Sequence, residues 1–297
     1  MTKILVTGGG GFLGAWIVKL LAAQGLTPRL FDKNINTPVV TAIAGAAAHT
    51  VEWIEGDITD TQAVIDAAQG CAGLIHLAAV LTPPCRDNPI FGAQVNVIGT
   101  LNVFEAAKRH HIPRVVYASS GAVFGPESGS IPAPMTHYGA FKLACEGCAR
   151  AYWHDAQIAS IGFRPTIIYG PGREIGLTAD ISLACRAAAR QQAYTIGFTG
   201  VQDLLYVEDT AAAFVAAALK PYQGAHAFSL TGGSYDVQDV ISRIKTLVPQ
   251  ADLKAQGPLV PMASVIARTP YEDVLGVLPH TPLQDGLAAT IAYYQSK

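Results

Sequence analysis

A run of four consecutive glycines near the N-terminus constrains the fold of this chain more than any other feature. The run follows the short apolar segment Ile4–Val6 and precedes Gly14 and the apolar segment Ala15–Leu21. This order is typical of a strand, a glycine-rich turn and a helix. Glycine lets the backbone turn tightly and approach a ligand closely, and the first turn of a helix presents unpaired N–H groups. We therefore expect a turn that can hold a phosphate group at the start of an α/β fold.

Two glycine spacings typical of dinucleotide-binding turns fit this run. Gly9, Gly11 and Gly14 match the pattern G-x-G-x-x-G, whereas Gly8, Gly11 and Gly14 match G-x-x-G-x-x-G. The run itself does not choose between them, because positions 8–11 are all glycine. The residues of the turn that we expect to contact a dinucleotide are Gly8, Gly11, Phe12, Leu13 and Gly14.

Two acidic residues follow the next two apolar segments. Asp32 stands eighteen residues after Gly14, where a carboxylate can bond a ribose diol and repel a 2′-phosphate. This position favours NAD over NADP, although Arg29 and Lys33 nearby leave NADP possible. Asp57, after the third apolar segment, could accept a hydrogen bond from an adenine amino group or cap the helix that follows.

Tyr138 and Lys142 lie four residues apart, a spacing that places both side chains on one face of a helix. A phenol with a pKa of about 10 is a poor base at neutral pH, but a neighbouring ammonium group lowers that pKa by favouring the phenolate. A phenol tuned in this way can carry a proton to or from a substrate. Such a pair occurs often by chance, so its meaning depends on the rest of the chain.

Apolar and amphipathic segments alternate along the first part of the chain. We expect strands near residues 3–7, 27–31, 50–54, 72–77, 114–118 and 158–163, and helices near 12–24, 38–46, 60–69, 89–110 and 137–154. This alternation predicts an α/β protein with a Rossmann-type doubly wound parallel sheet. Ligands of such sheets bind beyond the carboxyl ends of the strands, where the glycine turn and Asp32 lie.

The pattern loosens after Pro165, where glycine and proline recur. We expect helices near residues 178–191, 208–219 and 236–248, and short strands near 194–196 and 225–230. These elements predict two domains. Residues 1–165 would bind the nucleotide, and residues 166–297 would form a smaller, discontinuous C-terminal substrate domain, with residues 203–219 packing back on the first.

Several motifs occur together in an order that resembles the extended short-chain dehydrogenase/reductase family, also called the NAD-dependent epimerase/dehydratase family. The resemblance covers roughly the first two thirds of the chain. The residues that carry it are Thr7–Gly14, Asp32, Asp57–Ile58, His76–Ala79, Asn96, Gly99–Thr100, Tyr117–Ser120, Val123–Gly125, Tyr138, Lys142, Arg164–Gly172 and Tyr206–Asp209.

This resemblance implies hydride transfer between a substrate carbon and the nicotinamide of NAD by a Ser-Tyr-Lys mechanism. Tyr138 would move the hydroxyl proton, and Lys142 would lower the pKa of that tyrosine and bond the nicotinamide ribose. Ser120, rather than Ser119, would bond the substrate oxygen. The cofactor contacts that the resemblance implies beyond the glycine turn are Asp32, Asp57, Ile58, Leu77, Ala78, Ala79, Asn96, Tyr138, Lys142 and Pro165.

The substrate is less well defined by the sequence. Nucleotide-sugar epimerases of the family usually have Asn and Arg where this chain has Ile167 and Gln202. Because Arg suits bidentate phosphate binding and Gln does not, we expect a smaller substrate, such as a free sugar, a sugar acid or another hydroxy compound. An apolar wall near Val80 also admits a less polar ketone or alcohol. The expected substrate contacts are Val80, Thr82, Arg86 and Arg173, and the two arginines could meet a carboxylate.

Three functions remain open at this point. The first is an NAD-dependent oxidoreductase that acts on a secondary alcohol or ketone, the second is an epimerase that recycles tightly bound NAD, and the third is a non-catalytic NAD-sensing module. Dehydratases of the family commonly have an Asp-Glu pair where this chain has Gly121 and Ala122, which disfavours dehydration. Sensors often lose the tyrosine or the lysine. Both are present here, so we favour the oxidoreductase.

Composition limits the partners and the location. A net charge of −2 offers no field for nucleic acid, and no apolar segment reaches the roughly 20 residues that span a bilayer. The five cysteines are scattered, and the eight histidines show no metal-binding spacing. We expect a cytoplasmic protein without a metal. Family members commonly dimerise through the helices matched here by residues 89–110 and 137–154, so we also expect a homodimer.

Overall fold

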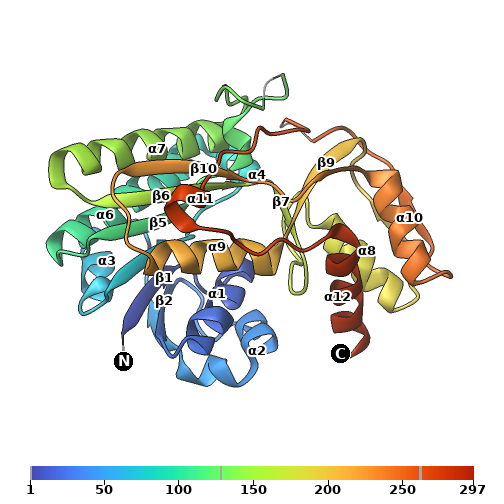
Figure 1. The fold of residues 1–297 in the computed structure, drawn as a ribbon, viewed down its shortest axis with the longest axis horizontal. Helices are drawn as coiled ribbons and strands as arrows, with labels where there is room; N and C mark the ends of the chain where they lie inside the picture. The colour runs from blue at the N-terminus through green and yellow to red at the C-terminus, as the bar shows by residue number, and fades with distance from the viewer. Residues whose placement is uncertain (1, 128, 261–262) are drawn as a thin grey trace.

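The computed structural model describes residues 2–127, 129–260 and 263–297. Its largest element is a seven-stranded sheet in which all neighbouring strands are parallel (Figure 1). In spatial order the strands are β10 (Ala225–Leu230), β6 (Ala159–Pro165), β5 (Arg114–Ala118), β4 (Gly73–His76), β1 (Lys3–Thr7), β2 (Thr27–Asp32) and β3 (Glu52–Glu55). This order confirms the predicted Rossmann-type doubly wound sheet.

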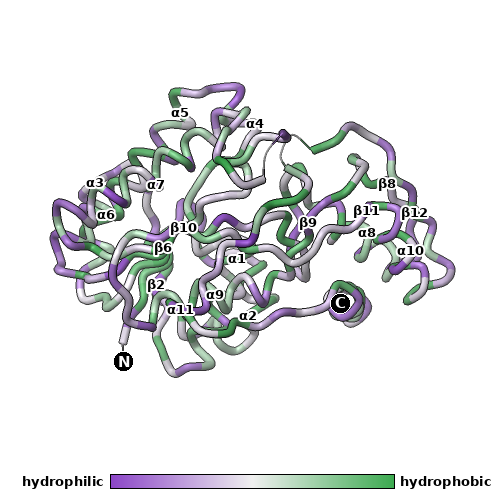
Figure 2. The backbone as a smooth tube through the Cα atoms, turned by 45° about the horizontal axis from the view of Figure 1, so that its top comes forward, coloured by the Kyte–Doolittle hydropathy of each residue, from purple (hydrophilic) through white to green (hydrophobic). Residues whose placement is uncertain are grey.

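Alternating side chains of these strands build a core on each face of the sheet. In β1, Ile4 and Val6 pack with helices α1 (Phe12–Ala23) and α9 (Val207–Leu219), whereas Leu5 packs on the other face. Successive side chains of a strand point to opposite faces, so one apolar segment serves both cores. Figure 2 shows the central strands largely in the hydrophobic colour. The helices of the second face are α3 (Thr61–Ala68), α6 (Gly99–Arg109) and α7 (His137–Ala156).

The chain leaves this sheet after β6 and returns to it with β10. On the way back, α9 packs against α1 and against strands β4 and β5. Strand β10 then pairs in parallel with β6, from Ala225 opposite Ser160 to Leu230 opposite Pro165. The sequence predicts a strand at 225–230 but does not place it in this sheet. The division into domains 1–165 and 166–297 stays a prediction.

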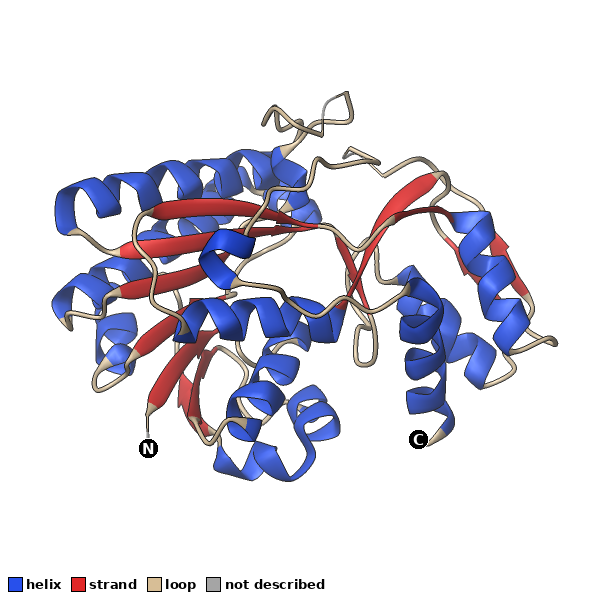
Figure 3. Cartoon of the chain, in the orientation of Figure 1, coloured by secondary structure: helices blue, strands red, loops and turns tan. Residues whose placement is uncertain are grey.

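A second group of elements lies beside the large sheet, and Figure 3 shows its shorter strands in red. Strands β7 (Ile167–Tyr169), β9 (Val201–Tyr206) and β11 (Ser234–Asp236) form a three-stranded sheet, and β8 (Tyr194–Ile196) pairs with β12 (Leu253–Ala255). Helices α8 (Asp180–Ala189), α10 (Val237–Leu247) and α12 (Leu283–Gln295) pack against these strands. The smaller helices are α2 (Pro38–Ala44), which packs on α1, α4 (Thr82–Asp87) and α11 (Glu272–Leu275).

The sequence pattern misses β7, β9, β11, β12, α4, α11 and α12. Most of these elements are too short to show a period. Helix α12 is long, but it contains Gly286 and Thr290, two residues of low helix propensity. Tertiary packing explains the glycine, because a Cβ at Gly286 would overlap the hydroxyl of Tyr169.

The predicted helix at 89–110 consists of three helical segments. Helices α5 (Pro89–Ala93) and α6 flank a π-helical turn, Gln94–Ile98. This wide turn carries Asn96, whose carboxamide bonds both the N–H and the carbonyl oxygen of Val80, at 3.1 and 3.0 Å. Such turns are frequent near functional sites. Asn96 therefore ties this helical region to the segment that follows β4.

Candidate active site

A cavity of about 920 Å³ opens at the carboxyl ends of the large sheet, where doubly wound proteins bind their ligands. The segments after β1, β2, β4, β5 and β6 all contribute to its walls. The residues singled out from the sequence that line it are Gly8, Gly11, Phe12, Leu13, Gly14, Asp32, Ile58, Leu77, Ala78, Ala79, Val80, Thr82, Ser120, Tyr138, Lys142, Pro165 and Arg173. Three expected contacts, Asp57, Asn96 and Arg86, are described by the structure but are not part of the lining.

Backbone contacts explain why the turn after β1 is rich in glycine. Gly8 has a φ of +68°, and a Cβ there would lie 2.5 Å from the backbone nitrogen of Ala78. A Cβ at Gly14 would overlap the backbone oxygen of Gly9. A Cβ at Gly11 would meet only the backbone oxygen of Gly8, at 3.4 Å, and no side chain caps helix α1, which begins at the next residue. The N-terminus of α1 therefore faces the cavity with room for an anionic group.

Alanine at Gly8 is expected to destabilise the protein by about 1–3 kcal/mol more than alanine at Gly25. The two glycines have φ values of +68° and +73°, so both substitutions carry the left-handed strain of about 1–2 kcal/mol. Only Gly8→Ala adds a clash, because a Cβ at Gly25 would meet nothing within 4 Å. Urea denaturation of the two variants measures the difference, and equal losses would contradict the clash.

Asp32 lies where the turns after β1 and β2 meet. Its carboxylate accepts hydrogen bonds from the backbone N–H of Gly10 at 2.9 Å and of Asn34 at 3.1 Å. The neighbouring Lys33 pairs with Asp57 at 2.9 Å. Partial burial acts to raise the pKa of Asp57, but the bond from the following turn and the Lys33 ammonium outweigh it and lower that pKa. Asp57 thus holds Lys33 beside this end of the cavity.

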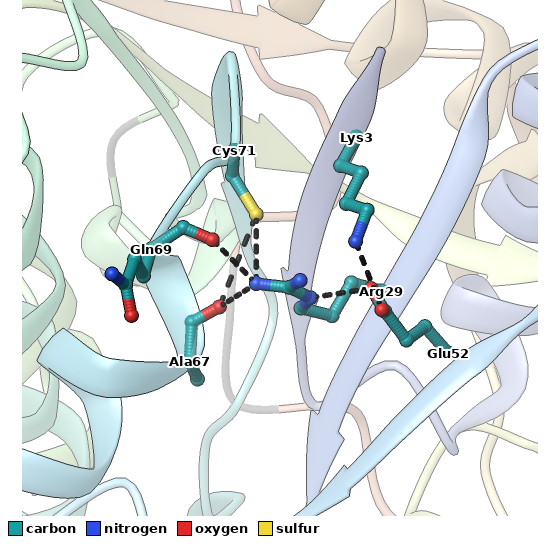
Figure 4. Close-up of polar contacts among 6 residues, drawn as sticks. All are labelled: Lys3, Arg29, Glu52, Ala67, Gln69 and Cys71. Atoms are coloured by element: carbon teal, nitrogen blue, oxygen red, sulfur yellow. Dashed lines mark hydrogen bonds and ion pairs between the residues drawn. The ribbon is translucent and has the colours of Figure 1, made fainter. Parts of the chain in front are cut away.

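Arg29 is not part of the cavity lining, and Figure 4 shows its guanidinium between Glu52 on one side and Ala67, Gln69 and Cys71 on the other. Its Nε donates to Glu52 at 2.6 Å, and its Nη1 donates to the carbonyl oxygens of Ala67 and Gln69 at 2.8 and 2.7 Å. The hydrogen bond with Glu52 raises the pKa of Arg29 further, and the same bond lowers the pKa of the Glu52 carboxyl. Of the two cations that left NADP possible, only Lys33 lies at the cavity.

Tyr138 and Lys142 lie one turn apart in α7, and both line the cavity. Lys142 is only 2 % exposed, and its ammonium group lies 5.7 Å from the centre of the Tyr138 ring. The ammonium also donates to the carbonyl oxygen of Ala118, the last residue of β5, at 2.7 Å. A buried charge needs such partners because its desolvation is costly. Lys142 therefore joins the start of α7 to the end of β5.

The two serines after β5 have different partners. Ser120 lines the cavity, and its hydroxyl oxygen accepts a hydrogen bond from the Ala122 N–H at 3.1 Å. Ser119 is 2 % exposed and donates to Glu146 at 2.6 Å. Glu146 is 1 % exposed and accepts two hydrogen bonds from Arg164, at 2.7 and 2.5 Å. Ser119 is thus committed to a buried ion pair, and Ser120 keeps a hydroxyl proton that a ligand can accept.

Two buried residues support the wall from behind. His76 shares hydrogen bonds with the hydroxyls of Thr7 at 2.7 Å and Thr100 at 3.0 Å. Burial lowers the pKa of His76 to about 3, and the nearby Lys142 charge acts in the same direction, so the imidazole is neutral. Asn96 is completely buried. The structure therefore places Asn96, an expected cofactor contact, behind the wall that it supports.

The two arginines considered as substrate contacts lie in different places. The side chain of Arg86, in α4, is 74 % exposed and pairs with the next residue, so the structure does not bring it to the cavity. Arg173 lines the cavity from the loop between β7 and α8. Its guanidinium donates to the carbonyl oxygen of Ile168 at 2.5 Å and to the hydroxyl of Thr178 at 2.9 Å. Burial lowers the pKa of Arg173 to about 10, while the nearby Tyr138 acts against that change.

Part of the lining is absent from the sequence-based prediction. The large apolar residues of the lining other than the expected contacts are Phe31, Leu81, Phe91, Val95, Ile167, Ile168, Ile175, Leu177 and Val260. Several come from loops, or from a helix that begins with proline, where no periodic pattern exists. The one local signal is the pair Ile175 and Leu177, two large apolar residues in a loop that is otherwise rich in glycine.

Within residues 2–127, 129–260 and 263–297, no three His, Cys, Asp or Glu side chains are placed to hold a metal ion. The helices of the same residues lack the combination of length and apolar character needed to cross a bilayer.

Comparison with known sequences identifies similar proteins. The family described as NAD-dependent epimerase/dehydratase matches residues 4–231. The UDP-glucose 4-epimerase of Mycolicibacterium smegmatis is 30 % identical over 244 residues, which are 78 % of this chain and 77 % of that protein. The 2-alkyl-3-oxoalkanoate reductase of Stenotrophomonas maltophilia is 34 % identical over 184 residues, which are 57 % of this chain and 52 % of that protein.

Comparison with solved structures extends the likeness to the whole fold. The UDP-glucose 4-epimerase of Thermus thermophilus, solved as a complex with NAD, superposes with a TM-score of 0.83 over 99 % of both chains. The sequence identity is 23 %, so this likeness concerns the fold alone.

Proposed function

The chain belongs to the NAD-dependent epimerase/dehydratase family, and we propose that it is an oxidoreductase that moves hydride between NAD and a secondary alcohol or ketone. One observation carries the proposal: Ser120, Tyr138 and Lys142 line the same cavity as the glycine turn. Residues 1–165 would hold the cofactor, and residues 166–297 would contribute substrate contacts such as Arg173. The substrate would be a small sugar-like compound, a hydroxy acid or another hydroxy compound.

The cavity fits NAD from the glycine turn to α7. Gly11 lines the cavity at the N-terminus of α1, which no side chain caps, and such a helix end suits a pyrophosphate. Asp32 lies beside that turn and can accept from the hydroxyls of a ribose. Ile58 would flank the adenine end of NAD, and the segment after β4 would flank its nicotinamide end. The contacts proposed from the cavity lining are Gly8, Gly11, Phe12, Leu13, Gly14, Asp32, Ile58, Leu77, Ala78, Ala79, Tyr138, Lys142 and Pro165.

Asparagine at Asp32 is expected to weaken NAD binding by about tenfold, because one charge-assisted hydrogen bond is lost. The same change removes the repulsion of a 2′-phosphate, so the affinity for NADP should rise toward that for NAD. Fluorescence titration with NADH and NADPH measures the affinities for the two cofactors. Asp66→Asn is the control, because Asp66 lies in α3 and is not part of the cavity lining. An unchanged ratio of the two affinities would contradict the role of Asp32.

The side chains at the other end of the cavity would handle the proton. When bound, NAD supplies the hydride acceptor. The phenol oxygen of Tyr138 would take the proton of the substrate hydroxyl, and the Lys142 ammonium would stabilise the negative charge on that oxygen. Ser120 would donate its hydroxyl proton to the substrate oxygen and hold it in place. Lys142 and Ser120 are both tied to the end of β5, so this arrangement is positioned before substrate binds.

Absorbance at the NADH band tests the proposal directly. Purified protein is incubated with NAD and a panel of free sugars, sugar acids and secondary alcohols, with UDP- and dTDP-sugars included. Accumulation of NADH with a member of the first three groups is the expected result. If the protein binds NAD but no compound yields NADH, and no ketone consumes it in the reverse assay, the oxidoreductase proposal fails.

A second candidate function is an epimerase that keeps its NAD bound. The observation that favours it is the 30 % identity, over most of both chains, with the UDP-glucose 4-epimerase of Mycolicibacterium smegmatis. Against it, Gln202 is 4 % exposed and donates to the carbonyl oxygen of Thr199 rather than reaching the cavity. An epimerase would copurify with NAD at close to one equivalent and interconvert UDP-sugars without net NADH.

The assembly that we propose is a homodimer through the helices at 89–110 and 137–154. Ile90 and Ile98 are 75 % and 44 % exposed on the first of these segments, and burial of such side chains favours association. Sedimentation of the purified protein measures its mass in solution.

A further inference from the structure

We propose that the substrate half of this cavity accepts a secondary alcohol or ketone with a hydrocarbon body, and not a nucleoside diphosphate. The inference rests on the proposed hydride transfer and adds the chemical class of the substrate. It comes from large apolar side chains that several separate segments contribute to the lining of the cavity that also contains Ser120 and Tyr138.

The apolar wall is built by two loops and a short helix. Leu81 precedes α4, Phe91 lies in α5, and Ile175 and Leu177 lie in the loop between β7 and α8. Leu81 is 44 % exposed, Leu177 is 59 % exposed and Ile175 is 85 % exposed. A hydrocarbon that covers these side chains removes apolar surface from water on both partners. Such exposed apolar surface inside a ligand cavity is typical of a binding site for an apolar group.

The loop between β7 and α8 approaches Leu81 closely. A Cβ on Gly176, between Ile175 and Leu177, would lie 3.6 Å from Leu81 Cδ1. Gly176 has a φ of +113°, so the loop turns sharply at the point where it meets Leu81. Leu81 and the two apolar residues of the loop therefore form one continuous rim, which a hydrocarbon chain can cross.

Charged side chains are few in this lining. The charged residues in the described lining are Asp32, Lys33, Lys142 and Arg173. The first two lie with the glycine turn, and Lys142 is buried against β5. The remaining charged residue of this lining is Arg173. A diphosphate carries two or more negative charges, so one arginine would leave most of that charge without a partner in a largely apolar space.

Arg173 is also engaged within the protein. Its Nη1 donates to the carbonyl oxygen of Ile168 and its Nη2 donates to the hydroxyl of Thr178. Its Nε is buried and has no hydrogen-bond partner among the described residues. Two of the five N–H donors of this guanidinium are therefore used within the protein, and those that remain, Nε–H among them, can bind a substrate oxygen, but one cation cannot balance the charge of a diphosphate.

The reaction on this substrate class balances without a further reactant. In the oxidation, the carbinol C–H bond breaks and its hydride passes to NAD⁺, the O–H proton passes to Tyr138, and a C=O double bond forms. The products are the ketone, NADH and one proton. The reduction of the ketone by NADH is the reverse.

A homologous series of ketones tests the inference. NADH consumption is followed with 2-butanone to 2-nonanone and with open-chain ketoses as polar probes, and NADH formation from NAD is followed with UDP-glucose. Each methylene that reaches the rim should raise kcat/KM about threefold to fourfold, until the hydrocarbon extends beyond it. In parallel, calorimetry of the protein with NADH measures the affinity for each ketone, which should rise in the same steps whether or not turnover occurs.

Substitution of the rim separates packing from chemistry. Leu177→Ser should lower kcat/KM for 2-nonanone about tenfold more than that for 2-butanone, because the longer chain reaches the rim. The control Val277→Ser, at a residue that is 91 % exposed and outside the cavity lining, should change neither.

The outcomes distinguish this inference from the proposed function. Hydride transfer to a ketose, with kcat/KM and affinity both independent of ketone length, would overturn the hydrocarbon substrate and leave the oxidoreductase standing. Tight binding of UDP-glucose, with its interconversion to another UDP-sugar, would overturn both the hydrocarbon substrate and the oxidoreductase function. Length-dependent binding without any hydride transfer would retain the apolar site and reject the reaction.

Discussion

Replacing Tyr138 with phenylalanine is expected to lower kcat by about 10²–10⁴-fold, the range typical for loss of a general acid–base group. The substitution removes one oxygen atom and leaves the ring, so the contact between the Lys142 ammonium and the ring remains. Binding of NAD should therefore change by no more than about threefold. Turnover measured with a substrate from the panel above, together with NADH titration, checks both parts.

The matched control is Tyr152→Phe on the same helix. Tyr152 lies in the C-terminal half of α7, where its hydroxyl donates to Glu105 at 2.7 Å, and it is not part of the cavity lining. This variant should turn over substrate at the rate of the parent protein. If Tyr138→Phe kept full activity, or if both variants lost it equally, the phenol of Tyr138 would not be the proton-transfer group.

Replacing Glu146 with alanine is expected to lower the free energy of unfolding by about 3–5 kcal/mol, the cost typical of leaving one member of a buried ion pair alone. Glu146 is 1 % exposed and the side chain of Arg164 is 13 % exposed, so water cannot take over the lost bonds easily. The Arg164 guanidinium also lies 5.2 Å from the centre of the Phe124 ring. Urea denaturation measures the loss.

Glu174→Ala is the control for a surface pair. Glu174 pairs with Arg186 at 3.0 Å, but its side chain is 53 % exposed, so its removal should cost less than about 1 kcal/mol. Glu146→Ala should also reduce kcat, because Ser119 loses its acceptor next to Ser120. Equal losses of stability in the two alanine variants would show that the buried pair contributes no more than a surface pair.

The nucleotide-binding half of the fold is predictable because its strands are local apolar segments. Strands buried on both faces of a parallel sheet appear as continuous apolar runs, and the predicted β1 and β5 match their observed bounds. Strand β9 lacks this signature because Gln202 and Asp203 interrupt it. The carboxylate of Asp203 accepts from the Thr166 hydroxyl and from the N–H of Gly232, partners that are distant in the sequence. Local patterns cannot show that these polar residues are satisfied inside the protein.

The candidate site also has a part that the sequence predicts and a part that it does not. Glycine spacing and the four-residue spacing of Tyr138 and Lys142 are local features, so the sequence alone places them at strand and helix ends. The cavity that contains both, and the apolar rim at Leu81 and Leu177, depend on how separate loops pack. Asn96 shows the limit, because its motif predicts proximity to the cofactor but not the bonds to Val80 that place it behind the wall. The chemical roles of all these residues stay predictions.

The return of the chain to the large sheet has a consequence for folding during synthesis. Strand β6 remains an open edge until β10 pairs with it, and about 60 residues separate the end of β6 from the start of β10. At typical rates of about 5–20 residues per second, the ribosome needs several seconds to add them. During that interval β6 exposes unpaired backbone groups that can pair with another nascent chain. Premature termination between the two strands would make that exposure permanent, so such truncated chains should be aggregation-prone even though they contain the entire glycine turn.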